Sequence, residues 1–120
     1  MIKELNGVNS LKNKVSIYVP STIDVYKTVD STPFVNEVAK ELCILFGGAT
    51  SQVAVGSWYS NELNKLVTEN VTIVYSFISD DDYTEENLTK VVNIAKKLCK
   101  DMSQECISVE VNNNLNFISC

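Results

Sequence analysis

The chain has 120 residues, of which 45% are hydrophobic and 21% are charged, and its formal net charge is −5. These proportions are typical of a single globular domain and exclude disordered and low-complexity classes. No apolar run approaches the ~18–20 residues that cross a bilayer, and no apolar segment of a secretory signal follows Met1. We therefore expect a cytoplasmic protein without membrane contact.

The missing residue types exclude several kinds of chemistry. All ten basic residues are lysines, and histidine is absent. Without histidine, the chain has no Ser-His-Asp or Cys-His nucleophile pair and no imidazole metal ligand. Without arginine it has no bidentate fork for phosphate, and an acidic chain lacks the basic surface of a nucleic-acid binder. We expect no nucleic-acid partner, no metal and no cofactor.

The four cysteines stand singly, at positions 43, 99, 106 and 120. No Cys-x-x-Cys pair occurs, so the sequence supports neither a zinc knuckle nor a thioredoxin-type redox motif. In a protein without a secretion signal the default state of cysteine is a reduced thiol. We therefore expect four reduced, partly buried cysteines.

The first half of the chain contains one strand and one helix after a polar arm, residues 1–13. Residues 15–19 alternate between apolar and polar, which predicts a half-buried strand ending at Pro20. A loop follows over residues 21–32. Thr32 is the expected N-cap of a helix with Pro33 in its first turn, and the glycines at 47 and 48 end this helix.

The sequence of the second half of the chain predicts four strands and one helix. Residues 50–59 form a strand in which Gly56 indicates a bulge or a close backbone approach, and residues 60–70 read as a polar connection. Residues 71–78 are apolar at nearly every position, which is typical of a central strand. The following acidic turn lacks the ligand spacing of a calcium loop. Then come a helix capped by Thr84 and strands at 106–111 and 115–118.

The order strand, helix, strand, strand, helix, strand predicts an α+β fold. It is the ferredoxin-like split βαβ arrangement, here followed by a short C-terminal hairpin strand. Right-handed crossovers place both helices on one face of an antiparallel sheet with strand order 4-1-3-2. We assign residues 14–120 to this single domain and expect Leu88, Val92, Ala95 and Leu98 to face the sheet.

This topology gathers aromatic and polar residues at one end of the sheet. The candidate binding residues there are Tyr18, Trp58, Tyr59, Glu69, Gln104 and Glu105. The second and fourth strands occupy opposite edges, about 14 Å apart at ~4.8 Å per strand, so Trp58 and Glu105 should not touch. We therefore expect a shallow, shared binding site with no catalytic pair of carboxylates.

Several short motifs also resemble a known group of proteins. They are residues 45–50 (Leu-Phe-Gly-Gly-Ala-Thr), residues 56–58 (Gly-Ser-Trp), Glu69, and residues 104–110, which begin Gln-Glu. This pattern is similar to that of a loose family of small, mostly uncharacterised bacterial ferredoxin-like proteins. The resemblance covers roughly residues 14–111. It implies a ferredoxin-like fold and no established activity.

Three classes of function remain open. We favour a small acidic, non-enzymatic binding or interaction module whose ligand the sequence does not identify. The first alternative is a phage or mobile-element accessory protein that inhibits a host factor, and the second is a small enzyme with a pocket formed by a ferredoxin-like dimer. Because helices cover only one sheet face, we expect a homodimer or a protein partner, with Ala54, Val74 and Ile78 on the uncovered face. A small-molecule ligand stays open.

Overall fold

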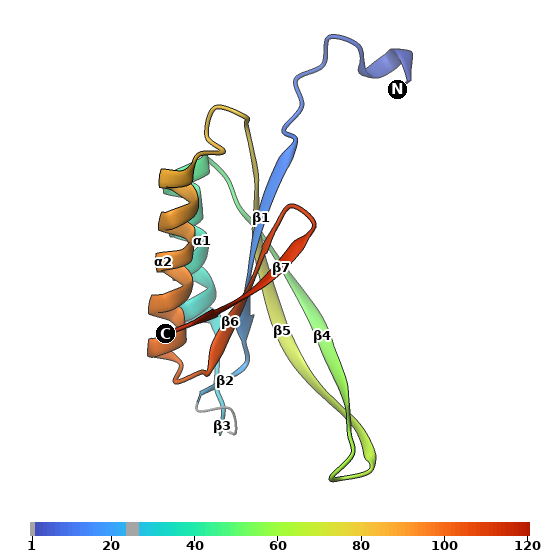
Figure 1. Cartoon of the computed structure of the whole chain (residues 1–120), viewed down its shortest axis with the longest axis vertical. Helices are drawn as coiled ribbons and strands as arrows, with labels where there is room; N and C mark the ends of the chain where they lie inside the picture. Colours follow the sequence, from blue (N-terminus) through green and yellow to red (C-terminus); the bar gives the residue numbers. More distant parts are fainter. Residues whose placement is uncertain (1, 24–26) are drawn as a thin grey trace.

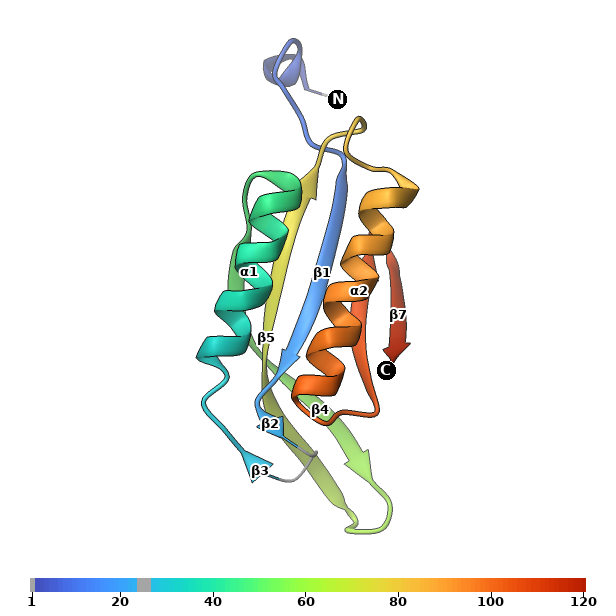
Figure 2. The same ribbon diagram turned by 90° about the vertical axis from the view of Figure 1, so that its left-hand side faces the viewer.

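Two helices lie side by side on one face of a five-stranded sheet in the computed structural model, which describes residues 2–23 and 27–120 (Figures 1 and 2). The sheet contains β1 (Asn13–Pro20), β4 (Thr50–Ser60), β5 (Lys65–Ile78), β6 (Cys106–Val111) and β7 (Asn114–Ser119). The helices are α1 (Thr32–Phe46) and α2 (Glu85–Asp101). Shorter elements are the 3-10 turn η1 (Lys3–Leu5) and the small ribbon β2 (Thr22–Ile23) and β3 (Lys27–Thr28).

The strand order is β4-β5-β1-β6-β7, and every neighbouring pair is antiparallel. It differs from the four-strand order 4-1-3-2 by the fifth strand, β7, which extends the sheet beside β6. The four strands expected before the C-terminal hairpin are β1, β4, β5 and β6, and they keep the neighbours that the expected order requires. The architecture is α+β and fits the ferredoxin-like class.

The core forms where β1 passes beneath the helices. Val15, Ile17 and Val19 are fully buried on the helix side, and burial of each such side chain contributes about 1.5–3 kcal/mol. Strand β1 pairs with β5 from Asn13 to Pro20 and with β6 on its other edge. The alternating pattern of the sequence therefore marks the innermost strand correctly.

The start of α1 differs from the expected Thr32 cap. Thr32 is already helical, and Ser31 at the N-cap position makes no capping hydrogen bond. Asp30 caps the helix instead, because its Oδ1 accepts hydrogen bonds from the Thr32 N–H at 3.0 Å and from Thr32 Oγ1 at 2.7 Å. The helix ends as expected at Gly47, whose φ of 91° is the left-handed conformation that glycine adopts readily.

Helix α2 begins as predicted, but its buried stripe is shifted. Thr84 Oγ1 accepts a hydrogen bond from the Asn87 N–H at 3.1 Å, which confirms the cap. Ala95 and Leu98 are buried as expected, together with Val91, Cys99 and Met102. Leu88 and Val92 are only half-buried. The stripe is centred on the line through Val91 because residues at i, i+4 and i+7 share one helix face.

The predicted polar connection at residues 60–70 is wrong, since both flanking strands continue through it. Strand β4 runs to Ser60 and β5 begins at Lys65, with a turn between them. Asn64 adopts a φ of 54° in this turn and accepts a hydrogen bond from the Tyr59 hydroxyl at 2.8 Å. Cross-strand pairing thus outweighs local polarity, and the β4–β5 hairpin extends past the end of β1 by about 20 Å at ~3.3 Å per residue (Figure 1).

Within the predicted loop at residues 21–32, the ribbon of β2 and β3 replaces irregular chain, and the Val29 N–H donates to the Ser21 carbonyl at 3.0 Å. Residues 24–26 lie outside the described part of the structure. The arm from residue 2 to residue 12 makes one turn, η1, and is exposed throughout. None of the helices in the described ranges is long and apolar enough to span a bilayer.

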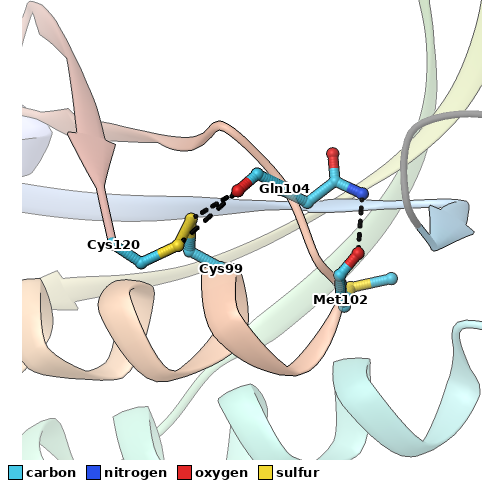
Figure 3. The surroundings of a disulfide bond; sticks show 4 residues. All are labelled: Cys99, Met102, Gln104 and Cys120. Carbon is cyan, nitrogen blue, oxygen red and sulfur yellow. Dashed lines mark hydrogen bonds between the residues drawn. A yellow bond between two sulfur atoms is a disulfide. The ribbon is translucent and has the colours of Figure 1, made fainter.

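A disulfide joins Cys99 in α2 to Cys120 beyond β7 (Figure 3). Their Cα atoms are 5.7 Å apart, because β7 returns the chain to the C-terminal end of α2. The expectation of four reduced cysteines is therefore wrong for this pair, and only Cys43 and Cys106 are free. Scattered cysteines give no indication of pairing in a sequence, since the fold decides which of them meet.

The bare face of the sheet carries a different set of β5 residues from the one expected. Val74 and Ile78 are buried on the helix side. Cross-strand partners share a face, so Ile73 opposite Tyr18 and Phe77 opposite Lys14 lie on the bare side. Phe77 is 50% exposed there. The prediction failed because both alternating sets of β5 are apolar, which leaves the choice of face undetermined.

Replacing Leu98 by alanine tests whether α2 anchors the fold. Leu98 is 4% exposed, so we expect Leu98→Ala to lower the free energy of unfolding in urea by about 2–5 kcal/mol. Val53→Ala is the matched control, because Val53 is 71% exposed and its truncation should change stability by less than about 0.5 kcal/mol. A loss below about 1 kcal/mol for Leu98→Ala would contradict this packing.

Candidate functional site

A groove of about 380 Å³ opens at the end of the sheet where β1 stops and the β4–β5 hairpin continues. We call it the sheet-end groove. Its lining comes from four strands and the turn before β6: Tyr18, Pro20, Ala54, Val55, Gly56, Glu69, Val71, Ile73, Gln104, Cys106, Ile107 and Ser108. Three of the six predicted site residues therefore line one groove, namely Tyr18, Glu69 and Gln104.

Tyr18 stands on the bare face near the end of β1. It pairs across the sheet with Ile73 and is half-buried. Burial raises the pKa of the Tyr18 hydroxyl above its usual value, and the negative charge of Glu110 raises it further. At neutral pH the hydroxyl is therefore protonated and able to donate a hydrogen bond.

Glu69 supplies the carboxylate of the groove, directly opposite Gly56. The two residues are paired in an unbroken ladder, so the bulge expected at Gly56 does not form. A Cβ atom at position 56 would lie 3.9 Å from the Glu69 carbonyl oxygen and 4.0 Å from its Cγ, which is ordinary van der Waals contact. The close backbone approach expected as the alternative to a bulge is therefore also absent, and Gly56 lines the groove beside Glu69.

Gln104 forms the wall of the groove and also holds the chain together there. Its Nε2 donates to the Thr22 carbonyl at 2.8 Å and to the Met102 carbonyl at 3.2 Å, the second of which is drawn in Figure 3. Its backbone carbonyl oxygen lies 3.2 Å from Cys99 Sγ, against the disulfide. Both amide hydrogens of the side chain are used within the fold, so Gln104 has a structural role as well as a place in the lining.

The other three predicted residues lie outside the groove. Trp58 is on the bare face but further along the hairpin, paired with Val67, and it is 51% exposed. Tyr59 points to the opposite face, since successive residues of a strand alternate. Glu105 is exposed and does not contribute to the lining. The long hairpin explains this outcome, because it carries Trp58 and Tyr59 away from the end of β1.

The groove floor is apolar, and the sequence indicated only part of it: Ala54 was expected on the uncovered face, whereas Val71 and Ile73 were not. Ala54, Val71 and Ile73 form this floor between Tyr18 and Glu69. Val71 and Ile73 alternate with the buried positions of β5, so the sequence could have located them only if the face that β5 buries had been known. The groove thus combines one carboxylate and one phenol with an apolar floor, which suits a cation attached to an apolar or aromatic body.

Metal chemistry finds no support at this site. Across residues 2–23 and 27–120, no group of three histidine, cysteine or acidic side chains is placed to hold a metal ion. The groove lining offers charge attraction by Glu69, hydrogen bonding by Tyr18 and Ser108, the free thiol of Cys106 and contact with apolar side chains.

Comparison with known proteins defines the fold and leaves the function open. No family model matches the sequence, and no curated protein matches it. A phage SAM lyase in complex with S-methyl-5'-thioadenosine superposes with a TM-score of 0.65 at 19% identity, covering 94% of this chain and 95% of that chain. A phage SAM lyase in the apo state gives the same TM-score and coverage at 20% identity.

A more distant likeness extends to a larger protein. A Bacillus cereus protein related to NIF3 superposes with a TM-score of 0.52 at 16% identity, covering 89% of this chain but 26% of that chain. Identities this low establish a shared fold and no shared activity. The bacterial family that the sequence motifs resemble stays a prediction.

The raised pKa of Tyr18 gives a prediction that does not depend on any ligand. The tyrosinate absorbance that Tyr18→Phe removes should appear at a higher pH than the ionisation of free tyrosine. Glu110→Gln should lower the pKa of Tyr18, because it removes a negative charge that favours the neutral hydroxyl.

The raised pKa of Tyr18 also determines how the free energy of unfolding changes with pH. The folded pKa of Tyr18 exceeds the unfolded value, so its stabilising contribution is complete below the unfolded pKa and is lost as pH rises through the folded pKa. If Tyr18→Phe left the alkaline part of the stability profile unchanged, the burial of Tyr18 described here would be wrong.

Proposed function

We propose that the sheet-end groove binds S-adenosylmethionine (SAM) and releases S-methyl-5'-thioadenosine from it, so that this chain acts as a SAM lyase. The observation that carries the proposal is the composition of the groove, in which Glu69 and Tyr18 flank an apolar floor. The likeness of the whole fold to a phage SAM lyase supports it. The proposal selects the small-enzyme alternative among the three classes left open by the sequence.

The charge of the substrate matches the charge of the site. SAM carries a permanently positive sulfonium, which a carboxylate such as Glu69 attracts and an aromatic face such as Tyr18 stabilises. The net charge of −5 also favours a cationic ligand over an anionic one. The apolar floor offers a surface for the thioether and adenine portions of the molecule.

The reaction needs none of the residue types that the chain lacks. The carboxylate oxygen of SAM attacks its own Cγ, so that a C–O bond forms while the bond from Cγ to sulfur breaks. The electron pair of that bond stays on sulfur, which leaves as a neutral thioether, and the four-carbon portion closes to homoserine lactone. Atoms and charge balance without water, an external nucleophile or a proton donor, so the absence of histidine is no obstacle.

The protein's part in this step is positioning. The two reacting atoms belong to one molecule, so holding them in contact supplies much of the rate gain. The protonated Tyr18 hydroxyl is suited to orienting an oxygen of the substrate, and Glu69 holds the sulfonium until its charge is lost.

Binding and turnover are measured separately to test this function. We expect SAM and S-methyl-5'-thioadenosine to bind in isothermal titration calorimetry, and chromatography to show conversion of SAM to S-methyl-5'-thioadenosine. Glu69→Gln should weaken binding of SAM by about tenfold or more with little effect on the neutral thioether, because only SAM loses an ion pair. Gly56→Val should weaken binding of both, since its side chain enters the groove.

Glu62→Gln is the matched control, because Glu62 is an exposed carboxylate in the hairpin turn outside the groove lining. It should leave binding and melting temperature unchanged. Absence of SAM binding at millimolar concentration would overturn the proposed function. Binding without conversion would return the chain to the binding module that the sequence favours.

We also infer that a second copy covers the bare sheet face, as the one-sided helix layer led us to expect. Large apolar side chains remain exposed there, with Phe77 at 50% and Phe117 at 67%. Covering them would also close the sheet-end groove over a bound ligand. Exposed patches of this kind on a soluble protein are typical of interaction sites.

Trp58 reports on this association, because it is the only tryptophan and lies half-exposed on the same face. We expect its fluorescence emission to shift to shorter wavelength as protein concentration rises, together with an increase of molar mass in light scattering. Phe117→Ser should reduce both changes. A monomeric mass at ~10 µM and above, with constant emission, would contradict association through this face.

A further inference from the structure

A second and larger groove lies on the other side of the molecule, between the outward faces of α1 and α2. Its volume is about 480 Å³. Its apolar floor consists of Phe34, Val38, Ile44, Leu45, Ile94 and Leu98. We call it the helix groove. It runs along α1 for about 16 Å at 1.5 Å per residue, and it shares no residue with the sheet-end groove.

The helix groove is open and its rim is acidic. Ile44 is 69% exposed in it, next to the apolar side chains of the floor. Glu37 and Glu41 line the α1 side. The α2 side carries two lysines that are already paired: Lys90 lies 3.5 Å from Glu86, and Lys97 Nζ donates to the Asp101 carboxylate at 2.9 Å. The complementary ligand is an apolar segment with positive charge beside it.

The N-terminal arm of the chain has these properties. Ile2, Leu5, Val8 and Leu11 recur at every third residue and are exposed by 62%, 47%, 53% and 54%. A repeat of three aligns these side chains on one side of a chain with three residues per turn, such as the 3-10 turn that Lys3–Leu5 already forms. The charged residues beside the stripe are Lys3, Glu4 and Lys12, so the arm carries a net positive charge.

The root of the arm directs it away from the helices of its own chain. Asn13 Nδ2 donates to Asp80 Oδ1 at 2.9 Å, and the Lys14 N–H donates to Asn112 Oδ1 at 2.9 Å. These bonds fix the end of β1, so the arm continues beyond the end of that strand. In Figure 1 the turn between β5 and α2 lies between the arm and the helices. To reach its own helix groove the arm would have to turn back, whereas it can reach the groove of a second copy in its present direction.

We propose that the N-terminal arm of one copy binds in the helix groove of a second copy. Ile2, Leu5, Val8 and Leu11 then cover the exposed Ile44 and its neighbours, and the lysines of the arm approach Glu37 and Glu41. This contact lies on the opposite side of the sheet from the ligand site and goes beyond the proposed function. It links copies in addition to any pairing of the bare faces.

Disulfide trapping between two chains tests the contact. One population carries Leu5→Cys and the other, with a different affinity tag, carries Ile44→Cys, both in a Cys43→Ser, Cys106→Ser background. Mixed and treated with oxidised glutathione, which takes up the two hydrogens of the thiols, they should form a cross-linked species bearing both tags. Asn9→Cys replaces Leu5→Cys in the control, since Asn9 lies outside the apolar stripe, and it should cross-link much less.

A single chain that carries both new cysteines distinguishes an arm bound in its own helix groove from an arm bound in the groove of a second copy. A link within one chain, independent of dilution, would show that the arm returns to its own groove and would overturn the proposal. Failure of both arrangements to cross-link would overturn it as well. The expected result is a link between chains, whose yield falls when the oxidation is carried out at lower protein concentration.

Charge substitutions test the same contact between arm and groove without cross-linking. We expect Leu5→Asp with Leu11→Asp to weaken self-association by about tenfold or more in sedimentation, and Ile44→Asp to do the same. SAM binding should be unchanged in these variants, because the helix groove is separate from the sheet-end groove. If the wild-type chain does not bind SAM while arm cross-linking is normal, only the proposed function has failed. Normal SAM binding without arm cross-linking shows that only the arm docking has failed.

Discussion

Val15, Ile17 and Val19 of β1 lie fully buried beneath α1 and α2, and the arrangement of the other strands follows from that contact. β1 is hydrogen-bonded to β5 along one edge and to β6 along the other, so it fixes the centre of the sheet. Since side chains alternate across a strand, burial of these three residues requires Tyr18 to stand on the opposite face. One strand therefore supplies both the core and a wall of the candidate site.

The site exists because β1 is shorter than its neighbour. β1 has 8 residues and β5 has 14, so β5 leaves the sheet paired with β4 alone. The step between the end of β1 and the continuing hairpin is the sheet-end groove, with Glu69 on the hairpin and Tyr18 on β1. The hairpin itself is an exposed ribbon, and two-stranded ribbons gain stability when a further surface packs against them. Ligand binding and self-association would both use this same bare face.

The chemistry proposed for the groove suits the composition of the chain. An intramolecular displacement with a neutral leaving group asks for attraction of a cation, orientation and exclusion of water, and an acidic protein without histidine can supply all three. The two grooves differ in kind as well as in place. The sheet-end groove pairs a carboxylate with a phenol, whereas the helix groove is an apolar trough with an acidic rim. A ligand and a protein segment can therefore be bound on opposite sides of the sheet.

The sequence by itself determined the element order, the class of fold, the central place of β1 and the caps at Thr84 and Gly47, because these depend on local alternation, helical spacing and turn chemistry. It also placed Tyr18, Glu69 and Gln104 at the right end of the sheet. Only the tertiary structure decided which face β5 buries, because both of its alternating sets are apolar. It likewise decided that β4 and β5 continue through residues 60–70, where pairing outweighs polarity, and that Cys99 meets Cys120. The continued pairing of β4 with β5 also carries Trp58 beyond the groove. The length of a strand depends on the strand it pairs with, and local composition does not identify that partner.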